Sequence, residues 1–286
     1  MPELPEVETI RRQLAPLLEG GTIEAVEVLD PRWSRPADPA EIGPACAGRR
    51  IEAVERRGKY LLMRLAGARS LIMHLRMTGN LLLRPEGLEP RFLRAVIRLE
   101  GGDELWFTDA RRFGHGEVLA DSELEGYFAS RLGIEPLSPE LTAESLGHLA
   151  SGRRAPLKSF LLAQEGVAGI GNIYADEALY RAQLHPLSPA GSMRPDHLEA
   201  LRAGIVAALE AGLANGGASI DDYLDSRGER GSMQDEFLVH TREGEPCPRC
   251  GETIRRIVVS GRSTYFCPGC QKRLRRRRRT AAARAR

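Results

Sequence analysis

Four cysteines lie close together near the C-terminus in the pattern C-x2-C-x16-C-x2-C, namely Cys247, Cys250, Cys267 and Cys270. Each C-x2-C pair can present two thiolates to one tetrahedral Zn²⁺ ion. Between the pairs, residues 253–259 and 262–266 predict a β-hairpin that turns at residues 260–261, and such a ribbon is too short to bury a core without metal. We expect one structural Zn²⁺ and no organic cofactor, in preference to two disulfides or an iron–sulfur site.

The fifth cysteine, Cys46, stands alone, and five cysteines among 286 residues are too few for a disulfide scaffold. We interpret Cys46 as a small, buried apolar side chain. The longest apolar runs, such as residues 81–83, fall far short of the roughly 20 residues that a membrane-spanning helix needs. Met1 begins a charged segment without a signal-like apolar block. We therefore expect a cytoplasmic protein without membrane contact.

The net charge of +2 conceals an uneven distribution. Residues 272–286 carry nine Lys or Arg and no acid, which leaves 32 basic and 39 acidic residues in the rest of the chain. Because the body is acidic, a nucleic-acid ligand would have to meet local basic patches. The basic tail is expected to be disordered and to add salt-sensitive DNA affinity that does not depend on base sequence.

The pattern of apolar residues changes along the chain. Short runs rich in Val, Ile and Leu predict a β-sandwich or barrel in the first third; they lie at residues 23–29, 51–57, 60–65, 71–75, 95–99 and 104–108. Helical spacing is found at residues 5–18, 124–132, 143–150, 157–162, 173–182 and 195–213. Residues 224–234, rich in Gly, Ser, Asp and Arg, indicate a flexible loop.

The N-terminus offers a nucleophile. Pro2 is small enough to permit removal of Met1, which would leave a free secondary amine followed by Glu3 and Glu6. Such an amine forms a cationic iminium with a sugar C1′ directly, and an α-amino pKa of about 8 leaves part of it unprotonated at neutral pH. Taken alone, the segment would equally suit an ordinary helix start with acids in its first turn.

Five further segments follow one another in a fixed order along the chain. They are MPELPEVETIRR at residues 1–12, RRGKYLL at 56–62, HLRMTG at 74–79, DARRFG at 109–114 and GIGNIYADEAL at 169–179. With the cysteine motif, they resemble the formamidopyrimidine-DNA glycosylase family from residue 1 to about 272.

The resemblance implies an α+β fold in five parts. These are an N-terminal catalytic β-sandwich domain (1–133), a linker (134–150), a helix-two-turn-helix domain with the lesion loop (151–234), a C-terminal zinc-finger β-hairpin (235–271) and the basic tail (272–286). The function implied is base-excision repair. An enzyme of this kind removes oxidised purines, that is 8-oxoguanine and formamidopyrimidines, from damaged double-stranded DNA and then nicks the abasic site by β,δ-elimination.

The resemblance also assigns catalytic residues. Pro2 matches the nucleophile that displaces the base and holds the sugar as a Schiff base, and Glu3 matches the acid–base residue. Glu6 is expected to help hold the site together. Lys59 matches a lysine for phosphate binding and β-elimination, and Arg262 an arginine for δ-elimination.

DNA-binding residues follow in the same way. Met77, Arg111 and Phe113 match the void-filling residues, which occupy the gap that a flipped base leaves in the duplex. Asn172 matches a phosphate-binding asparagine, and Arg153 and Lys158 lie in plausible phosphate range on the same domain. A monomer suits an enzyme that surrounds one lesion.

The chain departs from the family pattern at three places. Arg76 replaces a more frequent glycine, Phe92 replaces a DNA-contacting histidine, and His240-Thr241 replaces a common Tyr-Gly pair. None of these changes touches the nucleophile, so we expect altered phosphate contacts with the chemistry retained.

Two alternatives stay open. An endonuclease VIII-type enzyme for oxidised pyrimidines shares the fold, but such enzymes usually begin Met-Pro-Glu-Gly and lack the full void-filling set; Leu4, Arg111 and Phe113 favour the purine-specific branch. A non-catalytic zinc-finger DNA-binding protein would have no need of a free Pro2 amine.

Overall fold

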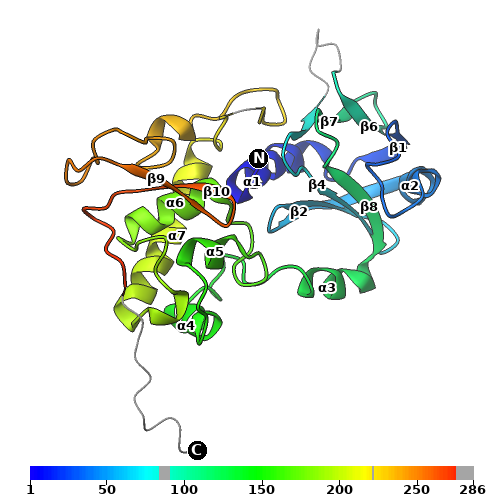
Figure 1. The fold of residues 1–286 in the computed structure, drawn as a ribbon. Coiled ribbons are helices and arrows are strands. Elements are labelled where there is room, and N and C mark those ends of the chain that lie inside the picture. Colours follow the sequence, from blue (N-terminus) through cyan, green and yellow to red (C-terminus); the bar gives the residue numbers. More distant parts are fainter. Residues whose placement is uncertain (84–90, 221, 275–286) are drawn as a thin grey trace, which may run out of the picture. The chain divides into compact units, whose positions relative to one another are not determined.

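The computed structural model describes residues 1–83, 91–220 and 222–274 (Figure 1). Most of the predicted basic tail, from residue 275 onward, lies outside the described residues. The chain divides into two compact units, and both are discontinuous in sequence. The first contains residues 1–132 and 209–236, and the second contains residues 133–208 and those from 237 onward.

The first unit is built on antiparallel strands. Neighbouring strands are hydrogen-bonded in the order β5-β7-β6-β1-β2-β3-β4-β8. Their bounds are β1 Thr22–Val28, β2 Arg49–Arg57, β3 Tyr60–Leu65, β4 Arg69–His74, β5 Gly79–Leu83, β6 Leu93–Leu99, β7 Glu104–Asp109 and β8 His115–Ala120. Strands β1 and β2 share only the pairs Thr22–Arg50 and Ile23–Arg49, so the order separates there into two four-stranded sheets. The predicted β-sandwich is confirmed.

The core of this unit draws apolar side chains from both sheets. Residues from β1, β6 and β7 meet residues from β2, β3 and β4 in one buried cluster, which includes Ile23, Ile97, Phe107, Ile51, Met63 and Leu71. Each such side chain contributes roughly 1.5–3 kcal/mol relative to exposure to water. Cys46 belongs to the same cluster, fully buried as predicted, and burial raises its pKa to about 12.

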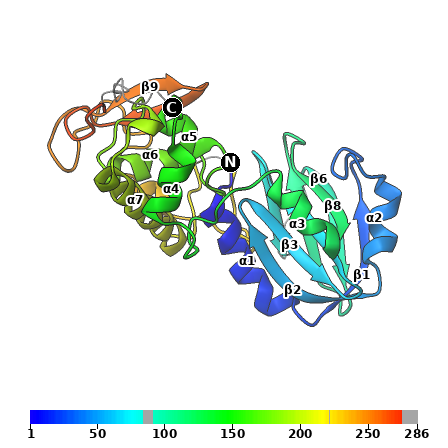
Figure 2. The same ribbon diagram turned by 90° about the horizontal axis from the view of Figure 1, so that it is seen from below.

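Helix α1, Leu4–Leu18, confirms the helical spacing expected at the N-terminus. It buries one face, formed by Leu4, Val7, Ile10, Leu14 and Leu18, and packs along β2 (Figure 2). Buried side chains three and four residues apart lie on one side of a helix. Because the sandwich holds that side, the first turn of α1 has a fixed place on it.

Three elements of the first unit were not predicted. Helix α2, Pro39–Cys46, contains Gly43 and Pro44 and lacks a helical apolar stripe. Strand β5 is an apolar run of the kind that periodicity alone does not assign. Strand β8 is mostly half-buried, so it has no alternating pattern to detect. Helix α3, Asp121–Ala129, begins three residues before the predicted helix.

The second unit contains the predicted helices and the hairpin. Its helices are α4 Ala143–Ala150, α5 Leu157–Leu162, α6 Asn172–Arg181 and residues 195–208 of α7, Pro195–Ala214. Strands β9, Arg255–Val259, and β10, Arg262–Phe266, pair as expected. Ser260 and Gly261 connect them with φ of +49° and +73°, as a tight hairpin turn requires.

Within the described ranges, no helix has both the length and the apolar character to cross a membrane.

Candidate active site and nucleic-acid interface

The first residues of the chain are buried at the start of α1. Pro2 and Glu3 are both buried, and Glu3 is the residue from which the helix begins. The backbone N–H of Glu3 donates to Glu6 Oε2 at 2.7 Å, which closes a capping box. The two carboxylates, each 1% exposed, therefore lie within one turn beside Pro2.

Glu6 also reaches a segment more than 200 residues away. Its Oε1 accepts a hydrogen bond of 2.8 Å from the N–H of Ala218. Gly217 has φ of +86°, and a Cβ placed there would lie 2.7 Å from Cγ of Glu6. Only glycine permits both this backbone conformation and this close approach. Glu6 thus joins the start of α1 to residues 217–218.

Lys59 lies in the turn between β2 and β3 and is 7% exposed. Arg56 ties this turn to α1: its Nη1 donates to the carbonyl of Gly58 at 2.9 Å, and its Nε donates to Glu8 at 3.2 Å. Burial raises the pKa of Glu8, but hydrogen bonds from Arg11 and Arg12 and the charge of Arg56 outweigh it, so the pKa is lowered overall. The predicted lysine and the predicted nucleophile thus lie on elements joined by ion pairs.

The residues predicted to fill the void, Met77, Arg111 and Phe113, lie on two loops that share one buried carboxylate. Asp109, 1% exposed, accepts hydrogen bonds from the hydroxyl of Thr78, next to Met77, and from the N–H groups of Arg111 and Phe113. Phe113 is 53% exposed, and the Arg111 guanidinium lies 5.0 Å from its ring centroid. An exposed aromatic ring on a rigidly held loop is suited to insertion into a base stack.

Residues 222–234, which include the loop predicted at 224–234, form hydrogen bonds to distant parts of the first unit. Asn80 of β5 holds the carbonyl of Asp222 and the N–H of Leu224 at 3.0 and 2.9 Å. Gln13 of α1 bonds to Asp225 at 2.6 Å and to the N–H of Ser226 at 3.0 Å. These partners lie far away in the sequence, and local composition therefore gave no sign of them.

A cavity of about 290 Å³ lies where this loop meets β5 and β7. Its lining is mostly polar and includes Thr78, Asn80, Asp109, Asp222 and Arg230, with Phe92 beside them. Phe92 is 54% exposed and has φ of +59°. The loop, the cavity and the loops that carry Met77, Arg111 and Phe113 thus belong to one region of the first unit.

In the second unit, Asn172 is the first residue of α6, and its Nδ2 donates to the carbonyl of Ser263 in β10 at 3.0 Å. Gln164 organises the preceding turn, because its side chain bonds to the N–H of Gly169 and to the carbonyl of Ile170 at 2.9 and 2.8 Å. The helix start at Asn172 is therefore held from the turn and from the hairpin.

The other predicted phosphate contacts differ in exposure. Arg153 is exposed, with its guanidinium 5.9 Å from the ring centroid of Phe160, and Arg262 is exposed at the start of β10. Lys158 is fully buried, and its Nζ lies 2.7 Å from both Asp176 Oδ1 and the carbonyl of Asn172. The amine of Lys158 is thus directed into the protein.

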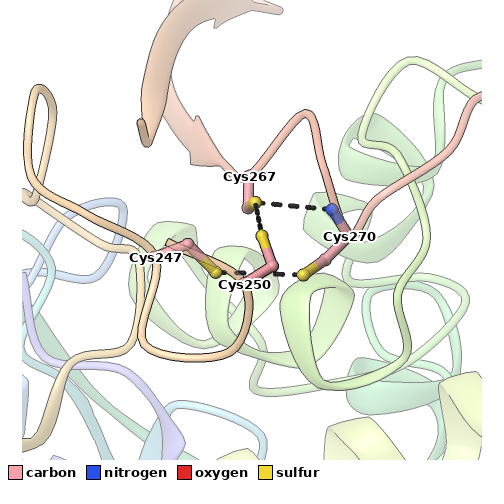
Figure 3. A group of neighbouring side chains, drawn as sticks. All are labelled: Cys247, Cys250, Cys267 and Cys270. Carbon is pink, nitrogen blue, oxygen red and sulfur yellow. Dashed lines mark hydrogen bonds between the residues drawn. The ribbon is translucent and has the colours of Figure 1, made fainter. Parts of the chain in front are cut away.

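The four cysteines converge as the spacing predicts (Figure 3). Their Sγ atoms all lie within 4.8 Å of one another, with Cys250–Cys267 at 3.4 Å and Cys247–Cys270 at 3.8 Å. Thiolates about 2.3 Å from a tetrahedral Zn²⁺ would be about 3.8 Å apart, so the set fits zinc. Burial and hydrogen bonds among the thiols raise the pKa of Cys270 to about 12, and a bound cation would favour its thiolate form beside the other three sulfur atoms. They form one structural Zn²⁺ site.

Several residues important to this geometry were not predicted. Asp109, Gln164, Asp176 and Glu177 lie inside or beside motifs that carried the resemblance, yet each acts on backbone or side-chain partners that only folding brings close. Glu8 and Arg56 also lie in such motifs, at residues 1–12 and 56–62, but nothing in the sequence indicated that they pair with each other. A buried carboxylate is recognisable from sequence only when its partner is known.

Family models match consecutive parts of the chain. The formamidopyrimidine-DNA glycosylase N-terminal domain matches residues 1–116, the formamidopyrimidine-DNA glycosylase H2TH domain matches 132–223, and the zinc finger found in FPG and IleRS matches 244–273. The chain belongs to the formamidopyrimidine-DNA glycosylase family. The fold class expected of this family, a β-sandwich with a helical H2TH domain and a zinc-finger hairpin, is confirmed.

Similar proteins cover nearly the whole chain. A formamidopyrimidine-DNA glycosylase of Chloroflexus aurantiacus is 46% identical over 273 residues, 95% of this chain and 98% of that protein. The crystal structure of the MutM (Fpg) protein from Thermus thermophilus is 41% identical with a TM-score of 0.85, over 95% and 99% of the two chains. Lactococcus lactis Fpg bound to DNA with an abasic site is 33% identical with a TM-score of 0.88, over 95% and 100%.

Proposed function

We propose that the chain is a bifunctional DNA glycosylase and AP lyase of base-excision repair, which removes 8-oxoguanine and formamidopyrimidines and then cleaves the abasic site by β,δ-elimination. The observation that carries this proposal is the buried start of α1, where Glu6 holds Pro2 and Glu3 beside residues 217–218. A binding module has no use for two buried carboxylates around an N-terminal proline. Burial of carboxylates costs free energy, and a catalytic role accounts for their retention beside the N-terminus.

The chemistry assigned to these residues is as follows. After removal of Met1, the Pro2 nitrogen attacks C1′ and forms a C–N bond while the bond from C1′ to the damaged base breaks. Glu3 transfers protons as the base departs and the sugar ring opens. Lys59, held in its turn through Arg56, assists β-elimination, and Arg262 braces the phosphate that leaves in δ-elimination.

DNA recognition uses two kinds of contact, one that fills the gap in the base stack and one that binds the backbone phosphates. Met77, Arg111 and Phe113 fill the gap left by the flipped nucleotide, and the support for this role is the shared anchoring of their loops by Asp109. Asn172, Arg153 and Arg262 contact backbone phosphates. Because Lys158 is buried, we assign it to holding Asn172 in place, without direct phosphate contact.

Damaged double-stranded DNA is the partner assigned to this chain. Relatives from Lactococcus lactis were crystallised with DNA containing Fapy-dG and with DNA containing an abasic site. We propose that the enzyme works as a monomer in the bacterial cytoplasm, at the nucleoid. The zinc hairpin supports DNA binding and carries Arg262 of the δ-elimination step, while its zinc ion takes no part in the covalent steps.

Borohydride trapping tests the proposal. A duplex with one 8-oxoguanine opposite cytosine is incubated with the protein and borohydride, and the adduct is mapped by peptide analysis. A covalent adduct on Pro2 is expected, and Glu3→Gln should reduce its formation by about a hundredfold. Trapping only on a duplex with an oxidised pyrimidine would assign the endonuclease VIII-type specificity, and no trapping on either duplex would favour the binding-only alternative.

A further inference from the structure

A buried ionic cluster joins three elements of the second unit. Lys158 of α5, Asp176 of α6 and His240 in the segment before the zinc hairpin are 0%, 1% and 5% exposed. Asp176 Oδ1 lies 2.7 Å from Lys158 Nζ, and Asp176 Oδ2 lies 2.9 Å from His240 Nδ1. One carboxylate therefore uses each of its oxygens to hold a different partner.

Lys158 transmits this geometry to Asn172. Its Nζ also lies 2.7 Å from the carbonyl oxygen of Asn172, the first residue of α6. The Asn172 side chain in turn donates to the carbonyl of Ser263, which follows Arg262 in β10. The cluster is thus linked by hydrogen bonds to Asn172 and, through its side chain, to Ser263, the residue that follows Arg262 in the hairpin.

His240 is itself fixed by its surroundings. The Glu177 carboxylate accepts hydrogen bonds from the N–H groups of three consecutive residues, with distances of 3.1 Å for Leu238 and 3.0 Å for both Val239 and His240. The ring packs edge-on against Phe237 and Tyr265, with centroids 5.2 and 5.1 Å away. Because the ring is held in one orientation by these contacts, its Nδ1–H is directed at Oδ2 of Asp176.

Folding stability alone gives no strong reason for a buried ionic cluster. A buried ion pair often contributes no more to folding than apolar residues of the same volume would, because removing the charges from water is costly. Its main effect is to fix the geometry of the groups that it joins. Here the groups joined are Asn172, through Lys158, and the hairpin strand that carries Arg262.

We propose that His240 is a positioning residue for the DNA-backbone contacts of Asn172 and Arg262, acting through Asp176 and Lys158. The inference rests on the proposed function, because it takes the phosphate contacts of these two residues from it. His240 occupies one of the places where the sequence departs from its family pattern. The departure thus has a specific partner, the Asp176 carboxylate.

Two substitutions separate the hydrogen bond from the packing. His240→Phe keeps a ring between Phe237 and Tyr265 but has no N–H to donate, whereas His240→Asn loses the ring and keeps a donor. His197→Leu is the matched control, because His197 is a histidine of the same unit, near the start of α7, without contact to the cluster. Zinc content is measured for every variant, so that loss of the metal site is recognised.

The measurements are the Kd for a duplex with a tetrahydrofuran abasic analogue across a salt series, and the ratio of δ- to β-elimination products on an abasic duplex. For His240→Phe we expect about tenfold weaker binding, a salt slope smaller by about 1, as for one lost phosphate contact, and a product ratio shifted toward β-elimination. His240→Asn should lie within about threefold of the wild type, and His197→Leu should match it.

The outcomes are distinct. A zinc-loaded His240→Phe with wild-type Kd, salt slope and product ratio would overturn the proposal, as would lower thermal stability with all three unchanged. If His240→Phe loses zinc, the test rests on His240→Asn, which keeps a hydrogen-bond donor. Weaker DNA binding and a smaller salt slope in zinc-loaded His240→Asn would overturn the role of the hydrogen bond. Failure of the proposed function is recognised separately, since the wild type itself would then form no adduct on Pro2.

Discussion

Glu6 and Ala218 are joined by a hydrogen bond of 2.8 Å from the backbone N–H to the carboxylate, across 212 residues of sequence. The other oxygen of the same carboxylate holds the N–H of Glu3. Glu6 is therefore the group through which residues 216–218 and the start of α1 keep a fixed distance from each other.

Glu6→Gln should lower both activity and stability. The amide retains one acceptor oxygen, so one of the two buried N–H groups loses its partner, at a cost of about 1–3 kcal/mol. A shift of the Pro2–Glu3 segment should reduce the rate of Schiff-base formation by about tenfold or more. Single-turnover trapping and urea unfolding measure the two effects. Wild-type rates in the variant would show that Glu6 does not position the site.

Arg56→Ala should slow strand cleavage more than base removal. The substitution frees the turn that carries Lys59 from α1, whereas Glu8 keeps its bonds to Arg11 and Arg12. We expect an about tenfold slower lyase step on a preformed abasic site. Arg12→Ala is the control, because it removes a bond from the same carboxylate at a side chain that is 58% exposed. Equal effects of the two variants would contradict the positioning of Lys59.

Removal of zinc should strongly weaken DNA binding while the first unit stays folded. Both tryptophans, Trp33 and Trp106, belong to the first unit, so their fluorescence reports on that unit alone. Cys250→Ser, or a strong chelator, should leave the fluorescence unchanged and weaken binding about a hundredfold, because the hairpin folds with its metal. Cys46→Ser should keep its zinc. Tight DNA binding without metal would refute the role of the finger.

Acid should destabilise the first unit through His74 and His115. Burial, together with the charge of Arg76, lowers the pKa of His115 to about 4, and burial also lowers that of His74. Between the ordinary value of 6.5 and pH 4, the unfolded chain binds more protons, so the free energy of unfolding falls as the pH falls. His115 accounts for roughly 3 kcal/mol of this loss. Urea unfolding of His115→Gln should show a flatter pH profile, and an unchanged profile would contradict the assignment.

Periodic patterns predicted the elements but not their long-range contacts. The helix α1, the strands β1 to β4 and the zinc hairpin each bury a regular stripe or carry a turn signal, so local sequence suffices for them. The partners of Glu6 and Asn80 come from residues 217–224, and those of Glu177 from residues 238–240. These pairings depend on the folded chain, which is why neither the loop's hydrogen bonds nor the buried state of Lys158 could be predicted.

Two departures from the family pattern have one backbone explanation. Arg76 and Thr241 stand where the family commonly has glycine, and their φ angles are +56° and +61°. A residue with a Cβ in this left-handed region is strained by about 1–2 kcal/mol, and a β-branched residue such as Thr241 is the less suited of the two.

Thr241→Gly should therefore stabilise the protein. The relief of strain exceeds the conformational entropy that glycine additionally loses on folding, which costs about 0.5–1 kcal/mol. The hydrogen bond from the Thr241 hydroxyl to the carbonyl of His240 is lost in the variant. We expect a net gain of about 0.5–1 kcal/mol in thermal unfolding of the zinc-loaded protein. Thr253→Gly is the control: Thr253 is exposed near the same hairpin and has no positive φ, so glycine there should destabilise by a similar amount. If both variants lose stability equally, the backbone conformation of Thr241 does not lower the stability of the protein.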